Sequence, residues 1–179
     1  PWVITLLYSS AFEPAVSLLQ WQIVGNVFKL ASWALAFSII AAARGKTFLL
    51  MELSFNIVFL GMVFVFLPHV GLEVTAFAFV LGYLVYLTIV YVLARSIHNF
   101  RWQTLSLSLL GLHTSLGVAL LVLALMAPLA AAIASPLLAT ATGLFGLRIV
   151  LSKVGKHGRY PTRLYGIFAK LGWPIQSAI

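Results

Sequence analysis

Residues 48–67 read FLLMELSFNIVFLGMVFVFL, and this stretch decides the fold. Its only charged residue is Glu52, and the other residues are almost all apolar. A helix needs about 20 apolar residues to cross a bilayer, because each residue adds about 1.5 Å along the helix axis. The stretch therefore predicts a transmembrane helix.

The composition of the whole chain agrees with this prediction. Hydrophobic residues make up 63% of the 179 residues and charged residues 8%, with a mean hydropathy of +1.10. Soluble domains carry about a quarter charged residues, which cover their surface. Lipid must cover the surface of this chain instead, and backbone in lipid must be helical. We predict an all-α integral membrane protein. The absence of cysteine excludes disulfides and cysteine-based metal sites.

Four further apolar segments accompany residues 48–67. We predict five transmembrane helices in one bundle, over residues 18–43, 48–67, 74–94, 105–126 and 129–151. A basic tail, residues 152–179, follows them. Apolar residues recur in the tail at helical spacing, at Leu164, Ile167, Phe168 and Leu171. The tail therefore forms either a short interfacial helix on anionic lipid or a loosely ordered segment.

The basic residues alternate between the connections of these helices. They follow the first, third and fifth helices, at Arg44, Lys46, Arg95, Arg101, Lys153, Lys156, Arg159, Arg163 and Lys170. The connections after the second and fourth helices contain none. The positive-inside rule then places the N-terminal end outside and the C-terminus in the cytoplasm. The net charge of +8 therefore indicates an interaction with anionic membrane lipid and not with nucleic acid.

A polar stripe marks the first helix. Gln22, Asn26, Lys29 and Trp33 follow helical spacing and share one face. Lys29 lies about 22 Å from Arg44 along the helix, in the outer half of the membrane. We expect this stripe to line a cavity in which Lys29 holds an anionic substrate. The alternative is a lysine that extends its side chain to the outer headgroups.

Glu52 is the acid that lies well inside a predicted helix. With Asn56 one turn above it, Glu52 is a candidate site for coupling to a proton or a cation. The alternative is a glutamate near a helix start, stabilised by the helix dipole and by Arg44 or Lys46. Its depth differs from that of Lys29 by roughly 13–16 Å, which argues against a direct salt bridge.

His113, in the middle of the fourth helix, is the third candidate for ion coupling, because histidine titrates near neutral pH. The alternative is an interhelical hydrogen bond. Three tyrosines of the third helix, Tyr83, Tyr86 and Tyr91, are interpreted as packing and interface aromatics. No glycine-rich phosphate loop, HExxH motif or cluster of acids occurs in the sequence. We therefore predict no enzyme activity, no metal and no cofactor.

Several short stretches carry a family resemblance. They are LYSSAF at residues 7–12, WQIVGNVFK at residues 21–29, ARGKT at residues 43–47, and Met51-Glu52. With them the sequence resembles the C-terminal half of the O-antigen translocase (Wzx-type) flippases, over roughly residues 1–125. These flippases belong to the multidrug/oligosaccharidyl-lipid/polysaccharide exporter superfamily. No charged segment precedes the apolar stretch after Pro1, so we expect a missing upstream part and not a signal peptide.

The resemblance implies a fold and a function. Such proteins place two six-helix bundles in a V around a central cavity. They move polyprenyl-pyrophosphate-linked oligosaccharide, such as an O-antigen repeat unit for lipopolysaccharide biosynthesis, across the bacterial inner membrane by alternating access. This chain would supply most of one bundle, and the N-terminal half of the transporter would be its partner.

The resemblance also assigns roles to residues. Lys29 would hold the pyrophosphate or a sugar, and Gln22 and Asn26 would line the cavity. The family commonly has an acid where this chain has Asn26, so the resemblance does not support ion coupling at that position. The alternative functions are a membrane polymerase or ligase acting on lipid-linked sugars, and a non-transporting membrane scaffold.

Overall fold

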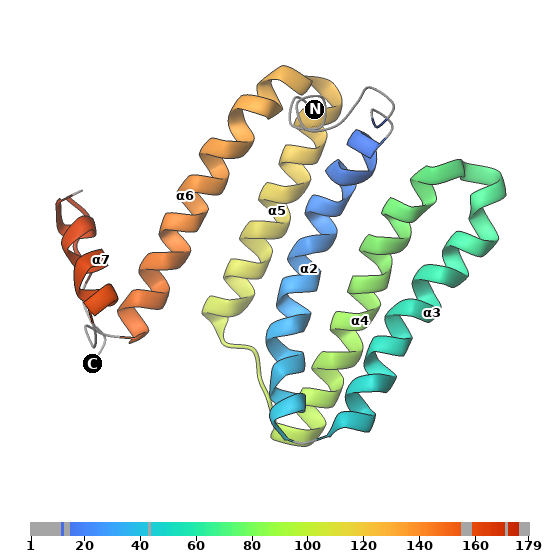
Figure 1. Cartoon of the computed structure of the whole chain (residues 1–179), viewed down its shortest axis with the longest axis horizontal. Coiled ribbons are helices and arrows are strands. Elements are labelled where there is room, and N and C mark those ends of the chain that lie inside the picture. The colour runs from blue at the N-terminus through green and yellow to red at the C-terminus, as the bar shows by residue number, and fades with distance from the viewer. Residues whose placement is uncertain (1–11, 13–14, 43, 155–158, 171, 176–179) are drawn as a thin grey trace. The chain divides into compact units, whose positions relative to one another are not determined.

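A computed structural model provides the structure, and it describes residues 12, 15–42, 44–154, 159–170 and 172–175. The described residues form helices and connections (Figure 1). The elements are α2 (Ala15–Ala41), α3 (Gly45–Val70), η2 (Gly71–Glu73), α4 (Val74–His98), α5 (Thr104–Met126), α6 (Pro128–Val154) and α7 (Arg159–Lys170). The prediction of an all-α membrane fold is confirmed.

Helices α2 to α6 each coincide with one of the five predicted segments. By length and composition, four helical stretches among the described residues could cross a membrane, one of them the 54 residues Gly45–His98. This long stretch is folded back on itself and comprises α3 and α4 (Figure 1). The structure therefore has the helices of a multi-pass membrane protein.

The fold-back depends on Gly71. Its φ of +71° lies in the left-handed region that a side chain disfavours, and its N–H donates to Leu67 O. Helix α3 continues through Pro68 to Val70, three residues beyond the end predicted at Leu67. Proline lacks a hydrogen-bond donor, but it does not end this helix. The conformation of Gly71 does.

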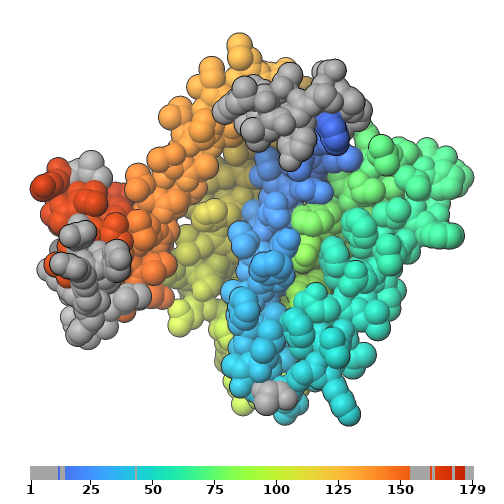
Figure 2. Space-filling model, viewed as in Figure 1, coloured from blue at the N-terminus to red at the C-terminus, as the bar shows by residue number. Residues whose placement is uncertain are grey.

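The chain divides into two compact units, residues 1–131 and 132–179, which are described separately. In the first unit α4 packs against α2 and α3, and α2 also packs against α5. Helix α4 is partly covered by α2 and α3 in the space-filling view (Figure 2). The largest fully buried side chains of this unit are Ile39, Met51, Val74, Tyr86 and Val90. The core of the first unit therefore lies around α4.

The outward faces of α3 and α5 are apolar as well. Phe64 is 88% exposed, and Leu49 and Leu50 are each 67% exposed. Exposed apolar surface of this extent needs lipid or another apolar partner to cover it. The exposed residues thus support the same conclusion as the composition.

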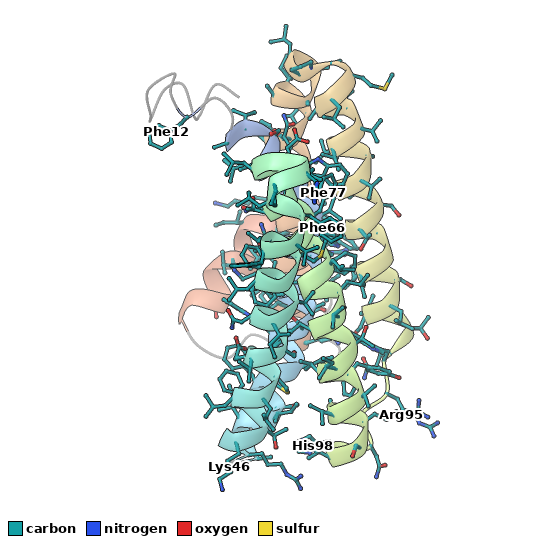
Figure 3. All side chains as sticks on the ribbon, turned by 90° about the vertical axis from the view of Figure 1, so that its right-hand side faces the viewer. Phe12, Lys46, Phe66, Phe77, Arg95 and His98 are labelled. Carbon is teal, nitrogen blue, oxygen red and sulfur yellow. The ribbon has the colours of Figure 1, made fainter. Side chains whose placement is uncertain are left out.

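Basic residues gather at one end of the first unit. Lys46, Arg95 and His98 lie at this end, whereas Phe66 and Phe77 lie toward the other end (Figure 3). The turn η2, which contains Glu73, joins α3 to α4 away from the basic end (Figure 1). The two basic connections of this unit therefore face the same side.

In the second unit, α7 folds back onto the C-terminal end of α6. Tyr165 Oη donates to Leu151 O at 2.7 Å, and Phe168 is buried beside them. The turn after α7 uses Gly172, whose φ is +72°. Beyond it, Trp173 lies under the Arg148 guanidinium, 4.5 Å from Cζ to the ring centroid. Of the two alternatives for the tail, the described part forms a helix.

Tyr165→Phe should loosen α7 without unfolding the chain. The variant removes a buried hydroxyl and leaves Leu151 O without that donor, at a cost of about 1 kcal/mol. Amide hydrogen exchange in α7 should then become about fivefold faster. Tyr91→Phe is the matched control, because no side-chain hydrogen bond of Tyr91 exists in the described structure. Equal exchange rates in both variants would contradict the role of this bond.

Candidate functional site

Two charged side chains inside the first unit, Lys29 and Glu52, lie beside a set of aromatic rings. Lys29 comes from the middle of α2 and Glu52 from the second turn of α3. The rings are Trp33 of α2 and Phe79, Tyr83 and Tyr86 of α4. We call these six residues the charged–aromatic cluster.

Lys29 is half-buried, and its ammonium faces three rings. The Nζ atom lies 4.8 Å from the centroid of Trp33, 5.5 Å from Tyr83 and 5.8 Å from Phe79. Aromatic faces attract a cation through their quadrupole but leave its full charge in place. No ion pair of Lys29 is found within the described part of the chain. The cluster therefore holds an ammonium whose charge is not neutralised.

The rings hold one another in position. Tyr83 lies 4.3 Å from Phe55 and 4.8 Å from Phe79 between ring centroids, and 6.1 Å from Tyr86. Aromatic pairs at these separations add stabilisation beyond the area that they bury. Two of the three rings that meet Lys29, those of Phe79 and Tyr83, are therefore fixed by packing.

The Glu52 carboxylate has a single hydrogen-bond partner among the described side chains, which is Tyr86. The Tyr86 hydroxyl donates to Glu52 Oε1 at 2.5 Å, and Tyr86 is 1% exposed. A short bond to a carboxylate is the stronger, charge-assisted kind. No ion pair joins Glu52 to Arg44 or Lys46 in the part of the molecule that the structure describes. Tyr86 therefore fixes the carboxylate.

The side chains of Glu52 and Asn56, predicted to form one coupling site, do not contact each other. Asn56 is exposed, and its Nδ2 donates to the backbone oxygen of Glu52 at 2.8 Å. An amide one turn along a helix reaches this carbonyl easily. The Asn56 side chain thus hydrogen bonds the backbone of its own helix and leaves the carboxylate to Tyr86.

Lys29 and Glu52 do not form a salt bridge, as their difference in depth leads one to expect. Aromatic rings connect them instead: Lys29 contacts Tyr83, Tyr83 contacts Tyr86, and Tyr86 binds Glu52. A cation and an anion thus lie in one cluster without neutralising each other. Movement of α4 would change the surroundings of both.

A cavity of about 300 Å³ opens beside the cluster. It is lined by Trp33, Ala36, Phe37, Ile40, Phe48, Glu52 and Tyr83. Of the predicted polar stripe, only Trp33 lines it. Asn26 is exposed and Gln22 is half-buried, while the flexible stem of Lys29 brings its ammonium to the rings of α4. The structure therefore brings together Lys29, Trp33 and Glu52, but not Gln22 or Asn26.

His113 lies apart from this cluster. Its Nδ1 hydrogen bonds Leu109 O at 2.8 Å, one turn earlier on its own helix. In the described structure His113 makes this bond within α5, and no bond to another helix is found there. A carbonyl four residues earlier on the same helix was within reach of the ring. His113 lines a second cavity, between α2 and α5.

Sequence reasoning missed the roles of Tyr83 and Tyr86. Their interpretation as packing aromatics is incomplete, because one ring contacts Lys29 and the other hydroxyl binds Glu52. A signal was present, since Phe79, Tyr83 and Tyr86 share one face of α4 at helical spacing. A face with two hydroxyl groups in a membrane helix needs polar partners on a neighbouring helix.

The fold and the site together define a multi-pass helical membrane protein with a charged–aromatic cluster inside its first unit. The described residues contain no group of three or more His, Cys, Asp or Glu that could hold a metal ion. Comparisons with protein-family models, with curated proteins and with solved structures give no match for this chain.

Proposed function

We propose that this chain is the C-terminal part of a flippase for polyprenyl-pyrophosphate-linked oligosaccharide in the bacterial inner membrane. The observation that carries the proposal is the Lys29 ammonium, which lies in mid-helix without an ion pair among the described residues. A charge inside a membrane protein is costly and usually serves a substrate or ion pathway. A diphosphate is a strong ligand for such an ammonium in a low dielectric.

The proposed orientation puts the basic end of the bundle and the C-terminus in the cytoplasm. Support comes from Lys46, Arg95 and His98, which share one end of the first unit (Figure 3). The tail contains five more basic residues, which favour a cytoplasmic C-terminus by the positive-inside rule. The lipid-linked sugar would then begin its passage at this basic end.

The alternating-access cycle is proposed to act on the charged–aromatic cluster. Lys29 and Glu52 both contact tyrosines of α4. A shift of α4 against α2 and α3 would therefore change the surroundings of both charged groups together. Lys29 would leave its aromatic rings to meet the pyrophosphate. Glu52 would be the group that a coupling proton or cation neutralises, and the opposing cavity wall would come from the N-terminal half.

Transport is favoured over a polymerase or ligase by the connections opposite the basic end. η2 contains three residues, and Ala127 alone separates α5 from α6. Membrane enzymes that join sugars outside the membrane need larger outer loops with acids, arginine or histidine. A scaffold, in turn, gives no reason for an ammonium in mid-helix.

The test is Lys29→Ala in the complete transporter. Transfer of lipid-linked oligosaccharide to the outer leaflet should slow by at least about tenfold, because one charge contact to the pyrophosphate is lost. Lys29→Arg should keep part of the rate. Glu73→Ala, in the exposed turn η2 away from the basic end, is the control and should leave transport near normal. A normal rate in Lys29→Ala would contradict the proposal.

A further inference from the structure

A second cavity, of about 470 Å³, lies between α2 and α5. It is lined by Val27, Leu30, Ala31, Ala34, Leu35, Phe100, Trp102, Ser106, Leu109, Leu110 and His113. We call it the α2–α5 groove. Apart from Ser106 and His113 its lining side chains are apolar or aromatic, and its volume is in the range of small-molecule sites. Its chemistry suits a hydrocarbon and not a sugar.

The groove runs along the helices. On α2 its lining extends from Val27 to Leu35, and on α5 from Ser106 to His113. These spans correspond to about 10–12 Å of helix axis. A single hydrocarbon chain parallel to the membrane helices fits this direction.

The end of the groove at the α4–α5 connection is aromatic and positively charged. Phe100 and Trp102 line it, 5.5 Å apart between ring centroids, and Tyr91 packs on both at 6.4 and 6.0 Å. The exposed Arg101 lies between these two residues in the chain. Arg95 and His98 lie at the same end of the bundle (Figure 3). An anionic group on the end of a hydrocarbon chain is therefore complementary to this mouth.

We propose that the α2–α5 groove binds the isoprenoid chain of a polyprenyl phosphate or pyrophosphate, with Arg101 on the phosphate. This inference rests on the proposed function and extends it to the lipid part of the substrate. The phosphate of such a lipid sits directly on the end of one chain. A phospholipid instead joins two chains through polar esters, and Ser106 is the sole hydroxyl in the lining near the mouth. The groove thus suits one chain with one charged end.

The test is photo-crosslinking of the whole chain in phosphatidylcholine nanodiscs with a benzophenone-tagged isoprenyl phosphate. Peptide mapping should place the crosslinks on residues 27–35 of α2 and 106–113 of α5. Ala31→Phe fills the groove and should reduce them at least tenfold. Ala119→Phe, on an exposed part of α5 outside the groove, is the matched control and should leave them unchanged. Arg101→Gln should weaken binding about fivefold, the effect of one basic residue near an anionic lipid.

Competition identifies the ligand. Untagged polyprenyl phosphate should displace the probe, whereas polyprenol and phosphatidylglycerol should displace it at least fivefold less well. Equal competition by phosphatidylglycerol, or crosslinks that Ala31→Phe leaves unchanged in a chain of normal helix content, would overturn the proposal. Neither result would affect the Lys29→Ala transport experiment, so failure of the groove and failure of the flippase assignment are separable.

Discussion

Gly25→Ala should destabilise the first unit by about 2 kcal/mol, although alanine is the better helix former. A Cβ at position 25 would lie 2.5 Å from Phe79 Cδ1 and 2.8 Å from Cε1, with the Val80 backbone 3.4 Å away. The Phe79 ring cannot swing aside freely, because it packs against Tyr83 at 4.8 Å. Helix α4 must therefore move away from α2.

Gly61→Ala is the control for this prediction. A Cβ there would meet nothing within 4 Å, so the same change in α3 should be neutral or stabilising by up to about 1 kcal/mol. The free energy of unfolding is measured by titration with a denaturing detergent in mixed micelles. Because Phe79 also faces Lys29, Gly25→Ala should impair transport as well. Equal stability of the two variants would show that the α2–α4 contact is looser than described.

The helices themselves could be predicted from the sequence. Long apolar stretches and alternating basic loops locate them, because the bilayer dictates both features. The end of α3 was placed too early, at Leu67, since the effect of Pro68 was overestimated and Gly71 makes the turn. Which helix lies at the centre could not be predicted. All five are apolar around most of their circumference, so hydrophobic periodicity does not separate the buried side from the lipid-facing side.

The site was only partly predictable for a related reason. Lys29 and Glu52 stand out because charges are rare in apolar helices. Apart from Trp33, their partners lie on α4, far away in sequence, and these contacts depend on how α2, α3 and α4 are rotated against one another. Close contacts such as Phe55 on Gly82 fix these rotations, and no sequence pattern encodes them directly. His113 bonds within α5, because its own helix offers an acceptor one turn away.

Tyr86→Phe should cost about 2 kcal/mol of stability, although it removes a single oxygen atom. The half-buried Glu52 carboxylate then loses the hydroxyl that binds it at 2.5 Å, and a carboxylate that loses a charge-assisted bond in a partly desolvated place is destabilised by this order of magnitude. Tyr83→Phe is the matched control. No hydrogen bond of the Tyr83 hydroxyl exists in the described structure, so its removal should change stability by less than about 0.5 kcal/mol.

The double variant Glu52→Leu with Tyr86→Phe decides whether the unpaired carboxylate is the cause. Removal of both partners leaves no carboxylate without its bond, so the double variant should be more stable than Tyr86→Phe alone. A double-mutant cycle on unfolding free energies should give a coupling of about 2 kcal/mol between positions 52 and 86. A coupling near zero would mean that Tyr86 acts by packing alone. Glu52 would then have no fixed partner on α4, and a movement of that helix would not change the surroundings of the Glu52 carboxylate.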